Sequence, residues 1–415
     1  MKIRKYWIAP IAMVLVPLGM FAQLNNLTGS PYSLFGLGVR TNSNIGKNNA
    51  LGKGGYALEA TDFINNFNPA AFAGIPKKNF LFDIGILTEL SRIESGNNDE
   101  RRLAGNISSI AIAASIDKNS GFGLTLDPLS DVGYAVVGIE SNIEGSLDSF
   151  VSSIFGSGGI SDLKLSYGYR INDYVKAGIG LSYLFGNITE TERINAGVSS
   201  LTVEETNVYS GGRVEVGLQG KFSNTFSFGT RWQLPTALNG KRDRSIQKII
   251  DLVPAPSTVE NTNDVDIPNF DLPLEVSTGV AFRPLPYLNF NLDYTKSYWN
   301  ATGQSDNIGD FIDQDIVAIG AEYMKDPDSF RYWERIQFRA GFNYDSGYLE
   351  VNNEAINSFS ITGGIGFPVG RLRLNLAYTY RESGSSNGIL VQEAFNTINI
   401  NFSLRDFWFL KRKVE

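Results

Sequence analysis

The stretch Leu372-Arg373-Leu374-Asn375-Leu376-Ala377-Tyr378-Thr379-Tyr380 carries the pattern that decides the fold. Its even positions are leucine or tyrosine, and its odd positions are polar or small. Because side chains of a β-strand point alternately to opposite faces, such a strand has one apolar and one polar face. The same alternation recurs at 288–295, 337–344 and 395–404. The sequence therefore predicts a protein built from half-apolar β-strands.

The composition excludes several classes of function. The chain contains no cysteine and no histidine. It therefore has no disulfide framework, no lipoprotein anchor and no thiol chemistry, and it lacks the commonest metal ligand and general base. No nucleophile elbow, phosphate-binding loop or zinc motif occurs. Since the formal net charge is −7, nucleic acid is disfavoured as a partner. We expect no enzyme, no cofactor and no nucleic-acid partner.

One acidic segment could offer oxygen ligands to Ca²⁺. It contains Asp306, Asp310, Asp313 and Asp315. The spacing is not that of an EF-hand, and exposed acidic loops are common. We therefore predict no metal site.

The N-terminus has the order of a secretory signal peptide. Lys2, Arg4 and Lys5 precede an apolar run over 7–18, and Gly19-Met20-Phe21-Ala22 follows. The alternative is an N-terminal membrane anchor, but the run holds two prolines and is short for a spanning helix of about 20 residues. We predict that residues 1–22 are a signal peptide cleaved after Ala22.

Fourteen segments read as strands, and together they span about 80–404. An exported chain with this pattern is either a soluble sandwich or a membrane barrel, because only helices and closed barrels satisfy all backbone hydrogen bonds in lipid. The segments are 80–91, 107–117, 121–131, 160–170, 175–186, 209–222, 226–234, 273–283, 287–298, 315–324, 335–344, 357–367, 371–381 and 395–404.

Charged residues at the polar positions favour the barrel, because they would line a wet or plugged lumen while the apolar face meets lipid. These residues are Lys164, Glu215, Asp293, Glu322, Arg339 and Arg373. Aromatic residues near strand ends fit the girdles found at membrane interfaces. They are Tyr183, Phe185, Trp232, Tyr294, Trp299, Tyr344, Tyr378 and Tyr380.

The alternating lengths of the connections between strands also favour a barrel. Short turns rich in Asn, Asp, Pro and Gly alternate with long segments, which we interpret as external loops of a barrel in the outer membrane of a Gram-negative bacterium. An even strand count places both barrel ends on the short-turn, periplasmic side. The long segments are 92–106, 132–159, 187–208, 235–272, 299–314, 345–356 and 382–394. The connection 325–334 falls on the short side but is longer than its peers.

Residues 23–79 precede the first strand and lack alternation. They are rich in glycine, and the stretch 57–72 is too apolar for the alternative, a loose periplasmic tail. Since wall side chains cannot fill the lumen of a fourteen-stranded barrel, this segment would plug it. We predict an all-β fold: a transmembrane antiparallel barrel of about 14 strands (80–404), an N-terminal hatch inside the lumen (23–79), and a periplasmic C-terminal tail (405–415).

Two stretches resemble the FadL-type family of outer-membrane transporters for long-chain fatty acids and other hydrophobic compounds. One is Phe67-Asn68-Pro69-Ala70-Ala71-Phe72, which is similar to the hatch motif of that family; the other is the glycine-rich stretch 156–186. The stretches 30–38 and 408–413 are similar to barrels of Bacteroidota, although a basic extension replaces the usual terminal aromatic residue. The resemblance implies that the hatch blocks the lumen and that hydrophobic substrate leaves sideways through a gap in the wall.

Three groups of residues are candidates for this mechanism. Asn68, Pro69 and Ala70 would hold the hatch turn, and Pro128 would break a ladder hydrogen bond and mark a wall kink or opening. Apolar residues in the long segments would line a pocket for cargo, or else pack the loops together. The pocket candidates are Val151, Ile154, Phe155, Leu234, Leu238, Ile249, Ile250 and Leu252.

Two functions remain open from the sequence. In the first, the barrel transports hydrophobic compounds by hatch-gated diffusion and lateral exit, with membrane lipid and a hydrophobic small molecule as partners. In the second, it does not transport, and serves the type IX secretion system as a cargo shuttle or a translocon accessory. The aromatic residues of 325–334 and of the C-terminal tail would then offer a docking face.

Overall fold

The computed structural model describes residues 28–41, 45–95, 98–142, 149–250, 256–306, 309–385 and 390–407. The predicted signal peptide, the pocket candidate Leu252 and residues 408–415 of the predicted tail lie outside these ranges. No helix in the described ranges has the length and apolar character needed to cross a membrane.

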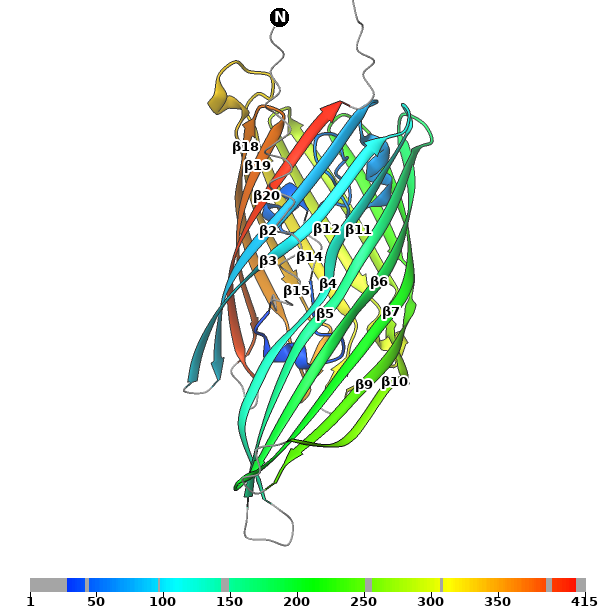
Figure 1. The fold of residues 1–415 in the computed structure, drawn as a ribbon. Helices are drawn as coiled ribbons and strands as arrows, with labels where there is room; N and C mark the ends of the chain where they lie inside the picture. The colour runs from blue at the N-terminus through cyan, green and yellow to red at the C-terminus, as the bar shows by residue number, and fades with distance from the viewer. Residues whose placement is uncertain are drawn as a thin grey trace, which may run out of the picture.

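The described strands form one antiparallel sheet that closes into a barrel (Figure 1). Fourteen strands make its wall, because β9 continues the short β8, and β10 runs on into β11. The first and last strands pair from Asn79↔Phe407 to Glu94↔Gln392, which closes the sheet. The wall strands are β2 (Asn79–Ser95), β3 (Asn98–Ser115), β4 (Ser120–Asn142), β5 (Ser149–Arg170), β6 (Val175–Ala196), β7 (Ser199–Lys221), β8 (Phe226–Gln233) with β9 (Thr236–Ile249), β10 (Ser257–Leu272) with β11 (Glu275–Leu285), β12 (Leu288–Ser297), β14 (Gln314–Tyr323), β15 (Gln337–Asp345), β18 (Ser358–Val369), β19 (Leu372–Gly384) and β20 (Gln392–Phe407).

The wall is polar inside and apolar outside, as the alternation predicts. On β19, Leu376 and Tyr378 are exposed on the outer face, whereas Asn375 and Thr379 are buried toward the lumen. Charged residues are buried inside as well, among them Lys164, whose Nζ lies 3.4 Å from a carboxylate oxygen of Glu215. The predicted fold class is confirmed.

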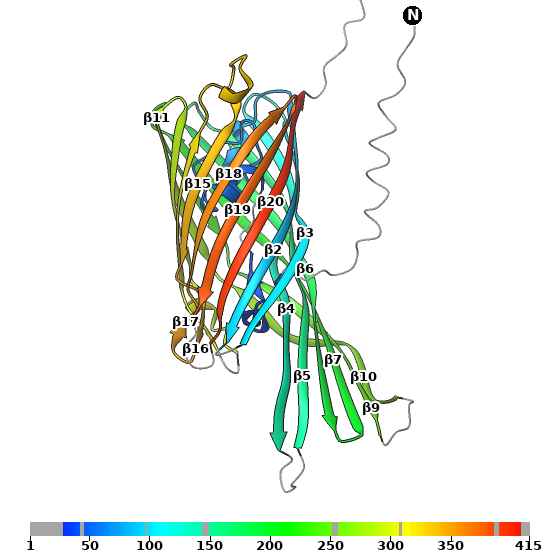
Figure 2. The ribbon, with the colours of Figure 1, turned by 90° about the vertical axis from the view of Figure 1, so that its left-hand side faces the viewer.

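The predicted positions of the long loops are largely wrong. β4 to β7 each have 22 or 23 residues, and β9 and β10 occupy most of the predicted loop 235–272. Their outer parts project beyond the rest of the wall at the end opposite the short turns, and we call them the strand extension (Figures 1 and 2). The alternation fades there because neither face meets lipid. The outer face of β6 changes from Leu181 and Tyr183 to Asn187 and Thr191.

True loops close the same end of the barrel above β12, β14 and β15. They contain η5 (Trp299–Thr302) and a small sheet of β13 (Asp310–Phe311), β16 (Leu349–Val351) and β17 (Glu354–Ala355). At the opposite end the short turns lie beside the first residue of β2 and the last residue of β20. The even strand count thus places both barrel ends on one side, as expected.

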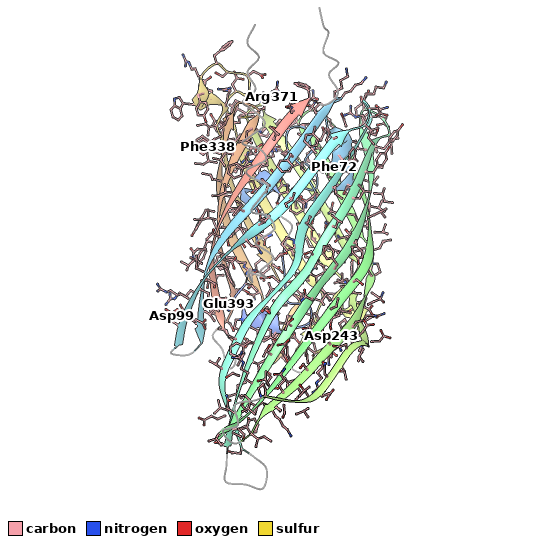
Figure 3. The ribbon with its side chains drawn as sticks, viewed as in Figure 1. Phe72, Asp99, Asp243, Phe338, Arg371 and Glu393 are labelled. Atoms are coloured by element: carbon pink, nitrogen blue, oxygen red, sulfur yellow. The ribbon has the colours of Figure 1, made fainter. Side chains whose placement is uncertain are left out.

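The segment that precedes β2 lies inside the barrel (Figure 1). It contains η2 (Pro31–Leu34), β1 (Val39–Arg40), η3 (Gly46–Ala50) and η4 (Pro69–Gly74), and we call its described residues 28–78 the hatch. Phe72, labelled in Figure 3, is fully buried between the hatch and the wall. At the other terminus, β20 runs to Phe407, so Arg405, Asp406 and Phe407 belong to the wall and not to a tail.

The outer face of β6 provides a test of the membrane boundary. Leu181 is 50% exposed in the apolar band. We expect Leu181→Arg to lower the free energy of unfolding by about 2–4 kcal/mol, because a lipid-facing arginine near the midplane must be dehydrated. Urea titration of the barrel refolded in vesicles measures this change.

Thr191→Arg is the matched control, since it lies on the same face of β6 in the strand extension. It should change the free energy of unfolding little. Equal destabilisation by both substitutions would contradict this placement of the membrane boundary.

Candidate functional site

The predicted hatch turn is tied to the wall through Asn68. The side chain is fully buried, and its Oδ1 accepts from Ala70 N at 3.0 Å, which caps η4. Its Nδ2 donates to the carbonyl oxygens of Tyr56, Leu218 and Thr230 at 3.1, 3.0 and 3.2 Å. One asparagine therefore links the hatch to both β7 and β8.

Glycines in the wall allow this close approach. A Cβ at Gly217 would lie 2.0 Å from Oδ1 of Asn68, and a Cβ at Gly178 would lie 2.3 Å from the carbonyl carbon of Pro69. Any larger residue would push the turn off the wall. The Asn-Pro turn is thus seated directly on β6 and β7, which places the predicted hatch motif against the wall.

Four ion pairs join the hatch to wall strands on several sides of the lumen. Each pairs a hatch side chain with a side chain from a different part of the wall, so that the hatch cannot tilt without breaking one of them. In a low-dielectric interior, removal of one partner leaves an uncompensated charge. The pairs are Arg40 with Glu275 at 3.2 Å, Lys47 with Glu322 at 2.9 Å, Glu59 with Lys176 at 2.7 Å, and Asp62 with Arg373 at 2.5 Å.

The wall splits between β3 and β4. These strands pair only from Ile110↔Leu126 to Ser115↔Gly121, near the short-turn end. Pro128, the predicted kink, lies two residues beyond the last pair, and the ladder between β4 and β5 shifts register between Pro128 and Ser130. Because proline cannot donate a ladder hydrogen bond, it suits the point where β4 leaves β3.

Beyond the split, the hatch takes the place of β3 along β4. β1 pairs with β4 at Val39↔Asp131 and Arg40↔Ser130. Next to it, Thr41 N donates to Leu129 O at 2.9 Å, and the Thr41 hydroxyl donates to Pro128 O. The hatch thereby covers the edge of β4 at the base of the split.

A central cavity of about 210 Å³ lies between the hatch and the wall. Ser108 of β3 and Pro128 of β4 both line it, so that it reaches the split. Most of the other lining residues are polar, and they include both carboxylates and cations. The cations are Arg40, Lys53, Lys164, Arg231 and Arg381.

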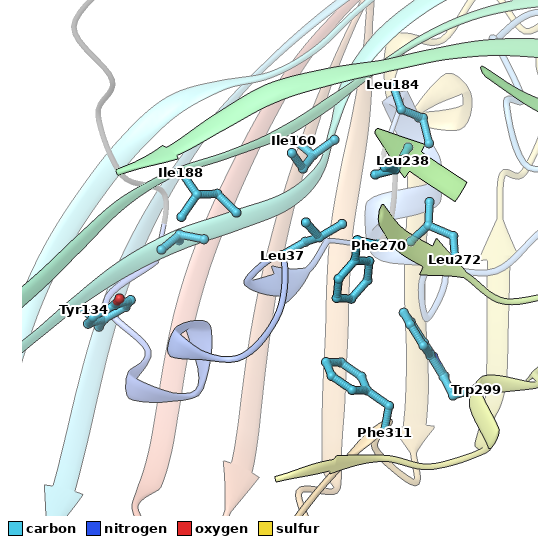
Figure 4. Close-up of a cluster of buried hydrophobic side chains, with 11 residues drawn as sticks. Leu37, Tyr134, Ile160, Leu184, Ile188, Leu238, Phe270, Leu272, Trp299 and Phe311 are labelled. Carbon is cyan, nitrogen blue, oxygen red and sulfur yellow. The ribbon is translucent and has the colours of Figure 1, made fainter. Parts of the chain in front are cut away.

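An apolar cluster lies inside the barrel on the strand-extension side of the cavity (Figure 4). Trp299 is 1% exposed, and its ring lies 5.2 Å from that of Phe311 and 5.5 Å from that of Tyr348. Leu37 of the hatch packs into the same cluster. The apolar space beside these rings is only about 10 Å³, which is room for one water molecule at most.

The predicted pocket residues are not brought together as one group. Leu238 is fully buried in the apolar cluster, and Ile154 packs against it. The others are distributed elsewhere: Val151 and Phe155 lie on the strand extension of β5, Leu234 is exposed at the break between β8 and β9, and Ile249 and Ile250 lie at the end of β9.

Sequence reasoning missed most of the cluster. Val132, Leu184, Phe270 and Phe311 were not singled out, and Trp299 was assigned to an interfacial girdle although it is buried. Several of these residues come from segments interpreted as loops, where the alternation is weak. In the described ranges, no group of three or more acidic residues is arranged to hold a metal ion.

The hatch turn yields a testable prediction. We expect Asn68→Ala to loosen the hatch, because it removes the hydrogen bonds from Asn68 Nδ2 to the wall carbonyl oxygens of Leu218 and Thr230, worth about 0.5–1.5 kcal/mol each. In planar bilayers the variant should show frequent open-channel events, whereas the wild-type barrel should stay closed.

Asn195→Ala, on the exposed part of β6, is the control and should behave like the wild type. Unchanged conductance in Asn68→Ala would mean that the turn does not hold the hatch in place.

Solved structures of similar fold were found among outer-membrane channels. The CymD monoaromatic hydrocarbon channel has a TM-score of 0.58 at 13% identity, over 89% of this chain and 99% of that chain. The toluene transporter TbuX of Ralstonia pickettii has a TM-score of 0.57 at 15% identity, over 86% and 97%. A FadL homologue of Pseudomonas aeruginosa has a TM-score of 0.57 at 12% identity, over 85% and 95%.

At such identities the likeness establishes the fold alone. The predicted resemblance to FadL-type barrels is thereby confirmed for the architecture, and the barrel is an outer-membrane protein. No curated protein sequence matches the chain. The family model described as BamG matches residues 2–415, and the chain therefore belongs to the BamG family.

Proposed function

We propose that this barrel carries hydrophobic compounds, such as long-chain fatty acids, across the outer membrane by lateral exit through the split between β3 and β4. The observation that carries the proposal is the end of β3–β4 pairing at Ile110 and Leu126, where the central cavity is lined by both strands. A continuous polar pore offers an apolar molecule no favourable environment, whereas an exit toward lipid transfers it directly into an apolar one.

Cargo enters from the side of the strand extension in this proposal. The buried apolar cluster around Trp299 and Phe311 then lies on the path of the cargo to the cavity. Since the space beside these rings is about 10 Å³, entry requires the cluster or the adjoining hatch residue Leu37 to move. The cluster thus serves as an outer gate.

The cavity favours cargo with a polar head. A cavity of roughly 150 Å³ holds benzene, so that about 210 Å³ accommodates part of a larger molecule. Lys53 and Arg381 lie in its lining, make no ion pair within the described residues, and can pair with a carboxylate. A fatty acid combines such a group with an apolar tail, and the tail would point to the split.

The solved structures of similar fold support the same class of cargo. They include a monoaromatic hydrocarbon channel and toluene transporters. These compounds are apolar and membrane-soluble. The shared architecture supports transport of hydrophobic compounds by this chain as well. The polar residues that line its cavity shift the expected preference toward amphipathic molecules.

A disulfide between the hatch and β4 tests the exit. Val39 and Asp131 are directly opposite in an antiparallel pair, where Cα atoms lie about 4.5–5.5 Å apart, within disulfide range. Because the chain has no cysteine, Val39→Cys with Asp131→Cys forms only this bond. In a deletion strain, the oxidised variant should lose fatty-acid uptake several-fold, and reduction should restore it.

The control places the same bond elsewhere on β4. Ser141→Cys with Phe150→Cys links β4 to β5 in the strand extension and leaves the hatch alone. Its uptake should not depend on oxidation. Equal uptake by the oxidised and reduced hatch variants would count against exit beside β1.

A second candidate is a barrel that does not transport and serves the type IX secretion system. The specific observation in its favour is the packing inside the barrel, where four ion pairs hold the hatch and an apolar cluster with aromatic rings lies on the strand-extension side. Purification from native membranes separates the two candidates. Stoichiometric secretion proteins, together with unchanged fatty-acid uptake in the deletion strain, would favour the second.

A further inference from the structure

One connection at the short-turn end forms an ordered projection. Residues 325–335, which join β14 to β15 and contain η6 (Tyr332–Arg335), are here called the rim lobe. Phe330 is fully exposed, and Trp333 is 78% exposed. Two large aromatic side chains that no part of the described chain covers mark a contact surface for something outside the barrel.

The rim lobe is held in shape by its own hydrogen bonds. The Glu334 carboxylate accepts from Lys325 Nζ at 2.8 Å and from Ser329 Oγ at 2.7 Å, and Asp326 N donates to Glu334 O at 2.9 Å. The hydrogen bond from Lys325 and then that from Ser329 lower the pKa of Glu334 below its ordinary value. The exposed rings are therefore presented by a defined scaffold.

The rim lobe continues the lipid-facing surface of the wall. Tyr323 and Phe338 form the cross-strand pair next to it, and both are exposed on the outer face. Tyr287, on the neighbouring connection, has its ring 5.9 Å from that of Tyr323. Figures 1 and 3 show the lobe beyond the rim on this side of the wall, with Phe338 just below it.

Cations accompany the exposed rings. Arg331 is 82% exposed at its side chain, Lys325 is 59% exposed, and the Arg335 guanidinium lies 5.6 Å from the centre of the Tyr332 ring. Tryptophan and tyrosine concentrate at membrane interfaces, and lysine and arginine reach lipid phosphates there. The lobe combines both kinds of residue next to the lipid-facing belt.

We propose that the rim lobe is a membrane-interface foot, with Phe330 and Trp333 seated in the phospholipid headgroup layer of the leaflet at the short-turn end. The exposed side chains of Tyr323 and Phe338 lie on the lipid-facing side of the wall, directly next to the rim lobe. This continuity favours lipid over a protein partner, because the lobe extends the same lipid-facing surface. This inference does not depend on what the barrel transports.

Site-directed spin labelling tests the proposal on the full chain. Since the native chain has no cysteine, Phe330→Cys and Trp333→Cys each carry one label. The variants are reconstituted in nanodiscs of phosphatidylethanolamine and phosphatidylglycerol, and relaxation by oxygen is compared with relaxation by a water-soluble nickel complex. We expect an oxygen-to-nickel ratio several-fold above that of an aqueous site.

Two further positions calibrate the scale. Lys118→Cys lies in another turn at the same rim and reports water, whereas Leu181→Cys lies on the lipid face of β6 and reports the bilayer. Both lobe positions should fall between these two. A ratio equal to that of Lys118→Cys at both positions would overturn the proposal and leave the lobe as a face for a protein partner.

Heat-stable migration on gels shows that each variant has folded, so that a high nickel accessibility cannot be ascribed to an unfolded chain.

A second measurement uses the native tryptophan, so that no spin label can disturb the rim lobe. In wild-type protein, lipid-attached quenchers at headgroup depth should reduce Trp333 fluorescence, taken as the difference from Trp333→Phe. Quenching by aqueous iodide alone would again contradict the proposal.

Discussion

The structure depends on one constraint, which is that backbone N–H and C=O groups inside a bilayer have no water to bond with. Each group left without a partner costs several kcal/mol. The sheet therefore closes from Asn79↔Phe407 to Glu94↔Gln392 and leaves no open edge between its first and last strands. One departure along the described wall is the split beyond Ile110 and Leu126, where β3 and β4 stop pairing. There the backbone of Val39, Arg40 and Thr41 supplies β4 with the partners that β3 does not.

The same constraint explains the polar interior. With every second side chain in lipid, the other half of each strand must face the lumen, and many of those positions carry charge. Lys164 of β5 forms a buried ion pair with Glu215 of β7, across β6, and Arg231 of β8 forms one with Glu275 of the neighbouring β11. Such pairs are costly to dehydrate and rarely add stability on their own. They do provide specific partners for the hatch, as Arg40 shows by joining Glu275.

The sequence predicted the barrel well and its outer end poorly. Strands in lipid alternate strictly, so Leu372–Tyr380 could be identified as a strand from its residues alone. The strand extension is different, because Asn187 and Thr191 of β6 face water and need no apolar residue. Its hairpins therefore looked like loops. The pocket candidates were chosen from these supposed loops. Leu238, for example, was interpreted as a loop residue, although it lies in a strand and packs into the apolar cluster. Pro128 could be singled out because a missing N–H is a property of the residue itself, and the last β3–β4 pair lies two residues before it.

By itself the sequence determined the class of fold, the inside-out polarity and the side on which both barrel ends lie, because these follow from a two-residue period and an even number of strands. It also marked Asn68 and Pro69 as the hatch turn through a resemblance. Only the tertiary structure decided what those residues contact. Asn68 reaches Leu218 and Thr230, some 150 residues away in the chain, and no local pattern records such a contact. The packing of Trp299 against Leu37 and Phe270 in the apolar cluster, and the pairing of the hatch with β4 in place of β3, arise in the same way from contacts between segments distant in sequence.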